Sequence, residues 1–199
     1  MYTLYGMTGS GNCYKPALLM KQLGLPFTWR EVNLLKGESH TPEFLALNPV
    51  GKVPTLVLPD GRALSESNAM LCYLAEGTAL LPADRYARAQ VLQWLFFEQY
   101  SHEPFIATVR FWIKFLGKRE AWAEKIADAR QKGVAALGVM EQQLAKTPFL
   151  TGAAYTVADI ALYAYTHVAH EGDYAMDDYP AIRAWLARIT SQPGFEPMG

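Results

Sequence analysis

The stretch NPVGKVPTLVLPDGRALSESNAM, residues 48–70, decides the fold. Its centre, VPTLVL at 53–58, is apolar and rich in β-branched residues, which predicts a buried strand. Asp60-Gly61 then predicts a hairpin turn into a second short strand. SESNAM, at 65–70, begins a predicted helix that ends near Gly77. A strand, a hairpin and a helix in this order are typical of the end of an α/β unit.

The residues before this stretch complete the unit. Tyr2–Tyr5 predicts a strand, and a glycine-rich loop follows at Gly6–Gly11. Apolar residues then recur at helical spacing until Gly24, which is typical of a residue just past a helix end. PFTWREVNL, at 26–34, alternates like a strand, and HTPEFLAL, at 40–47, predicts a short helix that begins with proline. The predicted order is β-α-β-α-β-β-α.

From about Leu81 onward, strand signals stop and helical periodicity takes over. Leu80–Asp84 is the predicted linker, so we expect one domain at residues 1–79 and a second, all-helical domain at 84–199. Thr156 and Asp159 have the spacing of a helix capping box, for which we expect a role in folding. The predicted helical stretches are 83–117, which is interrupted near Pro104, 119–146, 156–171 and 179–193.

Composition narrows the possible partners and surroundings. The 199 residues are 51% hydrophobic and carry a net charge of −1, so electrostatics indicate neither nucleic acid nor a membrane as a partner. Two cysteines cannot form a disulfide framework, which suits a cytoplasmic location. No signal peptide is visible at the start, and the most apolar stretch, 156–169, is too short and too polar to span a bilayer.

Two segments of the first domain predict recognition of a peptide-like ligand. A cis Val53-Pro54 bond would turn the backbone of Val53 outward, where an extended ligand could pair with it, although a proline that merely starts a strand is the commoner case. The helix start at Ser65-Glu66-Ser67 could bind a carboxylate through its N–H groups, with Glu66 binding an ammonium. The simpler alternative is that Ser65 caps the helix.

The loop GMTGSGNCYKP, Gly6–Pro16, leaves several chemistries open. It could cradle a phosphate, present Cys13 as a nucleophile, or present Ser10 to the thiol of a ligand. Its spacing does not match a P-loop, so a phosphate role is not expected. His167 and His170 form a lone His-x-x-His pair without a second set of ligands, and we predict no metal site.

The predicted strand order, the segment NPVGKVPTL, the Glu66-Ser67 pair and the all-helical second part closely resemble the cytosolic glutathione S-transferase family. The resemblance covers essentially the whole chain. It implies an α/β thioredoxin-like N-terminal domain followed by an all-α domain, a cis Pro54 and a homodimer. It also implies glutathione as co-substrate, with no tightly bound cofactor.

The same resemblance implies the residues that contact glutathione. Val53 would pair its backbone with the cysteinyl part, and Glu66 and Ser67 would bind the γ-glutamyl end. Lys52 would meet a carboxylate near the thiol or the glycine end. His40 is similar to a histidine of theta- and delta-like members, but it lies one position nearer the Asn-Pro pair than in their pattern.

Ser10 is the predicted activator of the ligand thiol. Counted back from Gly24, it occupies the position of the first cysteine in a thioredoxin-type Cys-x-x-Cys motif. The loop therefore resembles the serine-type loop of theta- and delta-like members, and the resemblance implies a bacterial member of the family. A serine hydroxyl can donate a hydrogen bond to a thiolate and so lower the pKa of the thiol. Asn12, where beta-like bacterial members place a cysteine, could be a second donor. Cys13 is expected to pack inward.

The predicted function is attack of the glutathione thiolate on a hydrophobic electrophile, as in detoxification. Phe105, Arg110 and Trp112 are the predicted residues of the second-substrate pocket, because aromatic residues gather in that helical stretch. A glutathione-dependent disulfide reductase or peroxidase would use the same site with another acceptor. A non-catalytic binding module is the third interpretation, although such a module has no need for a thiol-activating hydroxyl.

Overall fold

The computed structural model describes residues 1–199, which divide into two compact units. The first unit comprises Met1–Thr78 together with Gln192–Gly199, and the second comprises Ala79–Ser191. The expected linker, Leu80–Asp84, lies at the start of the second unit. The sequence predicted that the last segment, 192–199, belongs to the helical domain. In the structure it belongs to the first unit instead, because it packs along the first helix.

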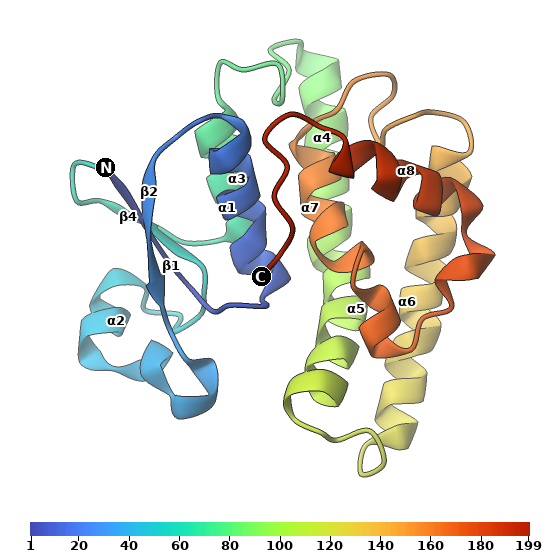
Figure 1. Ribbon diagram of the computed structural model, residues 1–199, viewed down its shortest axis with the longest axis horizontal. Coiled ribbons are helices and arrows are strands. Elements are labelled where there is room, and N and C mark those ends of the chain that lie inside the picture. The colour runs from blue at the N-terminus through green and yellow to red at the C-terminus, as the bar shows by residue number, and fades with distance from the viewer. The chain divides into compact units, whose positions relative to one another are not determined.

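A mixed four-stranded sheet forms the centre of the first unit (Figure 1). The strands run in the order β2-β1-β3-β4, with β1 parallel to β2 and antiparallel to β3. Leu4 of β1 and Leu56 of β3 pair directly and are fully buried, so the apolar residues of both strands contribute to one core. The bounds are β1 Tyr2–Gly6, β2 Phe27–Glu31, β3 Thr55–Val57 and β4 Ala63–Leu64.

The helices of the first unit complete the predicted order. Helices α1 (Gly11–Gln22) and α3 (Ser67–Ala75) pack against each other, and Figure 1 shows them on one side of the sheet. Their buried faces carry apolar residues such as Leu19 and Met70, neither of which is exposed. The connection from β2 to β3 contains α2 (Pro42–Leu47) and the short turns η1 (Leu34–Lys36) and η2 (Glu38–His40). The βαβαββα prediction is confirmed.

The second unit is entirely helical, apart from one isolated bridge between Phe149 and Gly152, as predicted. Helix α7 is buried along its whole length among the other helices of this unit. None of the helices in the chain combines the length and the apolar character that crossing a bilayer requires. The elements are α4 Arg85–Phe97, η3 Glu98–His102, α5 Glu103–Arg110, η4 Phe111–Phe115, α6 Ala123–Leu144, α7 Val157–Thr166, η5 Ala169–Gly172, η6 Met176–Asp178 and α8 Pro180–Thr190.

The long α-helical stretch is interrupted near Pro104, as the sequence predicted. The interruption is a π-helical turn at Glu98–His102, which follows the end of α4, and α5 begins directly after it. Proline lacks an N–H group, and its ring crowds the carbonyl four residues earlier. A widened turn ahead of Pro104 accommodates both effects while the helix continues.

The predicted capping box at the start of α7 is present and reaches further than expected. Asp159 accepts hydrogen bonds from the backbone N–H of Thr156 and from that of Leu150, both at 2.9 Å. Its Oδ1 also accepts from Nε1 of Trp185 in α8 at 2.9 Å. Burial raises the pKa of Asp159 to about 6, although these hydrogen bonds oppose the rise. One buried carboxylate therefore joins three segments, which agrees with a role in folding.

Candidate functional site

Glu31 organises the loop between β1 and α1. Its carboxylate accepts hydrogen bonds from the backbone N–H and the hydroxyl of Thr8, both at 2.9 Å, and from Nε1 of Trp29 at 2.8 Å. Partial burial raises the pKa of Glu31, but these three donors outweigh it and leave the pKa below its ordinary value. The sequence carries no sign of this role for Glu31, because Thr8 comes from a loop 23 residues away and belongs to no motif.

Ser10 is the N-cap residue of α1. Its carbonyl accepts the first helical hydrogen bond, from Tyr14, and its Oγ accepts from the backbone N–H of Cys13 at 3.5 Å. The Ser10 proton is not needed in that capping bond, so the hydroxyl can still donate. The first N–H groups of α1 converge beside it, as they do at any helix start.

Cys13 packs inward, as expected. It is fully buried, and its sulfur lies 3.4 Å from the backbone nitrogen of Met7. Burial raises the pKa of the Cys13 thiol to about 11, against the opposing effects of hydrogen bonds to Ser10 and Met7. A protonated, inaccessible thiol is not a nucleophile.

Asn12, Lys15 and Ser67 form a cluster that joins the starts of α1 and α3. Nζ of Lys15 lies 2.8 Å from Oδ1 of Asn12 and 3.3 Å from Oγ of Ser67. Ser67 also donates to Oδ1 of Asn12 at 3.4 Å. The side chain of Ser67 therefore faces α1. Because Ser67 is the first residue of α3, its backbone N–H is one of the N–H groups at the start of that helix. Sequence reasoning used Lys15 only to exclude a P-loop, although its i+3 spacing from Asn12 indicates a shared helix face.

The Val53-Pro54 peptide bond is cis, in agreement with the expectation. Asn48, which is buried, shapes the preceding loop: its Nδ2 donates to the carbonyl of Lys52 at 2.8 Å and to Oγ1 of Thr55 at 3.2 Å. Thr55 pairs with Tyr5, so continuing this antiparallel register places Pro54 level with Gly6. The cis bond thus lies beside the start of the loop that carries Ser10.

Glu66 has an unusual backbone conformation at the start of α3. Its φ is 67° and its ψ is 109°, a combination that residues with a side chain rarely adopt. It occupies the N-cap position but makes no capping bond with its side chain, which is exposed. Helix α3 begins at Ser67, so Ser65 is not the cap. The alternative of simple capping by Ser65 is therefore wrong, and the strained Glu66 points to a requirement beyond folding.

His40 and Lys52 flank the cis bond on the loop side. His40 is exposed, and its Nδ1 lies 3.1 Å from Oγ of Ser39. A side chain added at Gly51 would come within 3.1 Å of Nε2 of His40, so the imidazole lies against the loop that leads to Val53. The side chain of Lys52 is exposed as well. Both exposed side chains therefore belong to the segments that lead to the cis bond.

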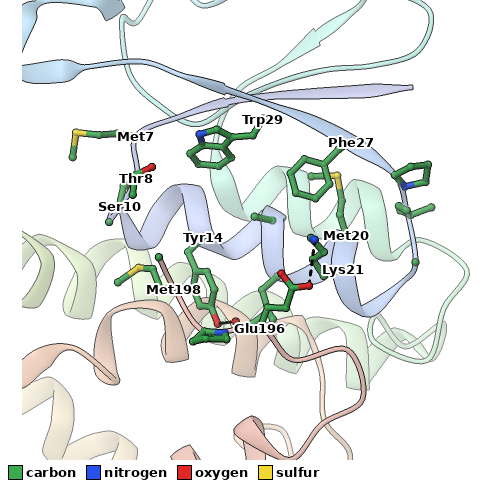
Figure 2. A pocket seen from close by; sticks show the side chains of 18 residues that line it. Met7, Thr8, Ser10, Tyr14, Met20, Lys21, Phe27, Trp29, Glu196 and Met198 are labelled. Atoms are coloured by element: carbon green, nitrogen blue, oxygen red, sulfur yellow. Dashed lines mark hydrogen bonds and ion pairs between the residues drawn. The ribbon is translucent and has the colours of Figure 1, made fainter.

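A groove of about 700 Å³ runs along α1 within the first unit. Figure 2 shows Thr8 and Ser10 near one end and Lys21 and Phe27 near the other. The last residues of the chain form one wall, where the hydroxyl of Tyr14 donates to the carbonyl of Glu196 at 2.5 Å and Lys21 pairs with its carboxylate at 3.2 Å. The remaining lining includes Met7, Leu18, Pro26, Trp29, Pro197 and Met198.

The predicted second-substrate residues lie in the helical unit, where local partners engage all three of them. Arg110 is buried, and its Nε lies 2.5 Å from a carboxylate oxygen of Glu171. Trp112 packs edge-on against Trp122, with ring centroids 5.7 Å apart. Phe105 is half-buried, and Nζ of Lys132 lies 5.6 Å from the centroid of its ring. These contacts do not gather the three side chains around one cavity, so the pocket stays a prediction.

The first unit thus combines a donor hydroxyl at a helix start, a cis Val53-Pro54 bond just before β3, and an exposed carboxylate at Glu66. Such a set can bind an extended peptide that has an amino-acid head group at one end and a thiol near the other. The helix start at Ser10 would favour the thiolate form of that thiol. No group of three or more His, Cys, Asp or Glu side chains is placed to hold a metal ion.

Two family models match most of the chain. The glutathione S-transferase N-terminal domain matches residues 9–76, and the C-terminal domain of the same family matches residues 84–188. Among curated proteins, glutathione S-transferase 3 of Zea mays is 34% identical over 97% of this chain and 90% of its own length. The disulfide-bond oxidoreductase YfcG of Escherichia coli is 31% identical over 92% of this chain and 87% of its own length.

Solved structures resemble the chain over its full length. A glutathione S-transferase from Pseudomonas fluorescens Pf-5 is 51% identical, with a TM-score of 0.97 over 99% of this chain and 98% of that one. A glutathione transferase from Burkholderia graminis, solved with two glutathione molecules per subunit, is 30% identical, with a TM-score of 0.85 over 97% of this chain and 85% of that one. The expected architecture, a thioredoxin-like domain followed by a helical domain, is confirmed.

Proposed function

Because the chain belongs to the glutathione S-transferase family, we propose that it is a serine-type transferase that activates the thiol of glutathione for attack on a small electrophile. The observation that carries this proposal is the convergence of three segments in the first unit. Hydrogen bonds through Lys15 join the starts of α1 and α3, and the strand register places the cis Val53-Pro54 bond beside the same loop.

Each segment has a role in binding glutathione. The backbone of Val53 pairs with the cysteinyl residue, and Glu66 binds the γ-glutamyl ammonium. The side chain of Ser67 is turned toward Lys15. The backbone N–H groups at the start of α3 therefore bind the α-carboxylate of the γ-glutamyl residue. His40 and Lys52 lie at the side of the loop where the glycine carboxylate would arrive. Glutathione seen bound in the Burkholderia graminis relative supports this ligand.

Ser10 then sets the protonation state of the bound thiol. Its hydroxyl donates a hydrogen bond to the sulfur, and the start of α1 adds a favourable field, so the thiolate predominates near neutral pH. Thiols in such positions fall from a pKa of about 8.5 into a range of about 3.5–7.5. The thiolate forms a sulfur–carbon bond to the electrophile, whose leaving group departs with the bonding electron pair. Cys13 takes no part, because its thiol is buried and protonated.

Titration of the bound thiol in a Ser10→Ala variant tests this role. Ultraviolet thiolate absorbance of bound glutathione should show a thiol pKa raised by about one unit, which corresponds to about 1.4 kcal/mol of lost thiolate stabilisation. The exposed Ser191→Ala variant in the helical unit is the matched control and should leave the titration unchanged. A Ser10→Ala titration that coincides with that of the unchanged protein would refute the serine-type assignment. Failure of the unchanged protein to bind glutathione in calorimetry would refute the whole proposal.

A disulfide reductase is the second candidate, because the Escherichia coli relative is a disulfide-bond oxidoreductase. The same thiolate would attack a sulfur of a disulfide, forming a mixed disulfide and releasing the other sulfur as a thiolate. A second glutathione would then resolve the mixed disulfide. Parallel assays with a chlorinated aromatic electrophile and a small disulfide separate the two reactions, since only the first forms a glutathione thioether.

We also propose that the protein works as a homodimer in the cytoplasm and serves in detoxification of hydrophobic electrophiles. The family resemblance supports the dimer, and the absence of a disulfide framework from a chain with two free cysteines suits a reducing compartment. Light scattering after size-exclusion chromatography gives the mass in solution, and a mass of one chain would refute the dimer.

A further inference from the structure

We propose that the groove along α1 binds the apolar part of the electrophile, so that the enzyme prefers acceptors with an elongated apolar tail. The inference rests on the proposed function and names the class of its second substrate. Ser10, the residue proposed to bind the glutathione sulfur, lines one end of the groove. An acceptor whose reactive carbon meets that sulfur can therefore extend its tail along the helix.

The groove has the dimensions of a small-molecule site. Its volume of about 700 Å³ lies within the range of about 300–1,000 Å³ that is typical of ligand pockets. It follows α1 from Ser10 to Lys21, a span of about 16 Å at a rise of about 1.5 Å per residue. A site of this length accommodates an extended tail as well as the reactive end of the acceptor.

A small residue opens the middle of the groove. The residues of α1 that line it share one helix face, with the spacing i, i+3, i+4 and i+7: Tyr14, Ala17, Leu18 and Lys21. Leu18 is buried and contributes apolar surface to the floor. Ala17 is half-buried and is the smallest of the four, so it leaves space for a ligand between two larger side chains.

Trp29 forms a preformed aromatic wall. Its Nε1 donates to Oε2 of Glu31 at 2.8 Å, which fixes one edge of the indole. A Cβ added at Gly6 would come within 2.5 Å of Cη2 of Trp29, so the ring rests directly on the glycine backbone. Phe27 lies two residues earlier on β2 and shares the same face, and Figure 2 shows both rings on one side of the groove. A wall that is already ordered binds a tail at a low cost in entropy.

The last segment, 194–199, forms the opposite wall. A Cβ added at Gly194 would come within 2.9 Å of Cα of Gln22, so the backbone packs closely against the end of α1. The bonds from α1 to the carbonyl and the carboxylate of Glu196 hold the segment farther along the helix. Met198 then lines the groove across from the two aromatic rings (Figure 2). Apolar side chains are thus held on both sides of the groove.

The chemistry and the selectivity belong to different parts of the groove. At the Ser10 end, the glutathione thiolate forms a bond to the reactive carbon, and the leaving group departs with the bonding electron pair. Along the rest of the groove, the tail contributes only by leaving water. A methylene group that is fully buried should strengthen binding about fourfold, and one with a side still exposed about twofold.

S-alkylglutathiones test the groove without requiring turnover. They carry the alkyl tail on the glutathione sulfur itself, so the tail begins where the acceptor would. In calorimetry of the series from S-ethyl- to S-decylglutathione, the Kd should fall about two- to fourfold for each added methylene until the tail reaches the end of the groove. Equal Kd values for the shortest and the longest compound would overturn the proposal.

An Ala17→Phe variant should remove most of this dependence on tail length. The added ring fills the middle of the groove, which a decyl tail must pass and an ethyl tail does not reach. The ratio of the Kd for S-ethylglutathione to the Kd for S-decylglutathione should therefore fall about tenfold or more. The exposed Ala127→Phe variant on α6 is the matched control and should keep the original ratio. A ratio in Ala17→Phe equal to that of the control would refute the groove as the acceptor site.

A second variant guards against poor folding of Ala17→Phe. Met198→Glu leaves α1 unchanged and places a carboxylate on the wall formed by the last segment. The same ratio should again fall about tenfold or more, because a buried tail would have to remove that carboxylate from water. Met176→Glu, at another half-buried methionine in η6, is its control and should keep the ratio. An unchanged ratio in Met198→Glu would contradict the proposal.

The outcomes separate this inference from the proposed function. If the unchanged protein binds neither glutathione nor any S-alkylglutathione, both fall. If it binds glutathione, and the dependence on tail length survives in Ala17→Phe but disappears in Trp112→Ala, the acceptor binds in the helical unit. Only the assignment of the groove then falls, and the proposed activation of the thiol by Ser10 stands.

Discussion

Glycine at position 66 should make the protein more stable and a weaker binder of glutathione. Glu66 adopts a φ of 67° and a ψ of 109° and makes no capping bond with its side chain. A residue with a side chain in such a region costs about 1–3 kcal/mol, and glycine avoids most of that cost. Glycine also adds freedom to the unfolded chain, worth about 0.5–1 kcal/mol in the opposite direction. Glu66→Gly should therefore stabilise the fold by about 1 kcal/mol.

Binding should change in the opposite direction. The carboxylate of Glu66 is proposed to accept a hydrogen bond from the γ-glutamyl ammonium. Hydrogen bonds to charged groups contribute about 1.5–3 kcal/mol, so loss of this one should raise the Kd for glutathione by about 10- to 100-fold. A strained residue that weakens the fold while strengthening ligand binding is the expected signature of a functional site.

Urea denaturation and calorimetry measure the two effects on the same variant. The control is Asp173→Gly, which removes the other side chain with a positive φ, 62°, in the helical unit. That variant should leave glutathione binding unchanged. If Glu66→Gly lowers the denaturation midpoint, the backbone is not strained at this position. If it raises the midpoint but leaves the Kd unchanged, Glu66 does not contact glutathione.

Two further predictions concern buried groups. Under native conditions an alkylating reagent should leave Cys13 unmodified, because its thiol is inaccessible and its pKa is raised to about 11 by burial; mass spectrometry of native and denatured samples checks this. Asp159→Ala should lower the free energy of unfolding, measured by urea denaturation, by about 3 kcal/mol or more. It leaves three buried donors without an acceptor, and each such loss costs about 1–3 kcal/mol. The control Asp84→Ala, which removes an exposed helix cap, should lower it by only about 1 kcal/mol. Burial raises the pKa of Asp159 from 3.8 to about 6, so its ionisation opposes folding; the loss in Asp159→Ala should therefore be larger at pH 5 than at pH 7, and a loss that grows with pH would contradict this reasoning.

The order of elements could be predicted from the sequence because it depends on local signals. Alternation with period two marked β2, an apolar β-branched run marked β3, helical spacing marked α1, and glycines near positions 24 and 77 marked the helix ends. The Thr156–Asp159 box was visible for the same reason, since its two residues are neighbours on one turn. The further bonds of Asp159 to Leu150 and Trp185 were not visible, because only the tertiary fold brings those donors to it.

The parts of the site that escaped prediction depend on contacts between distant segments. Glu31 carries no motif, yet it shapes the loop before α1 by binding Thr8 and Trp29. The chain's last residues lack periodicity, so their packing along α1, through the bond from Tyr14 to Glu196, could not be inferred. Sequence patterns fix what a residue can donate or accept. They do not fix which remote partner it meets.

Lys15 shows why such contacts matter for chemistry at the site. In the sequence, Ser10 and Asn12 are two polar residues on one loop, and either could activate a thiol. In the structure, Ser10 uses its oxygen as a helix cap and retains a proton to donate, whereas Asn12 accepts a hydrogen bond from Lys15 through its side-chain oxygen. The side chain of Asn12 is therefore held by a contact within the protein, and the hydroxyl of Ser10 can still donate to a ligand. An anionic sulfur is the ligand atom that such a hydroxyl would stabilise most, and a neutral thiol would gain less from it.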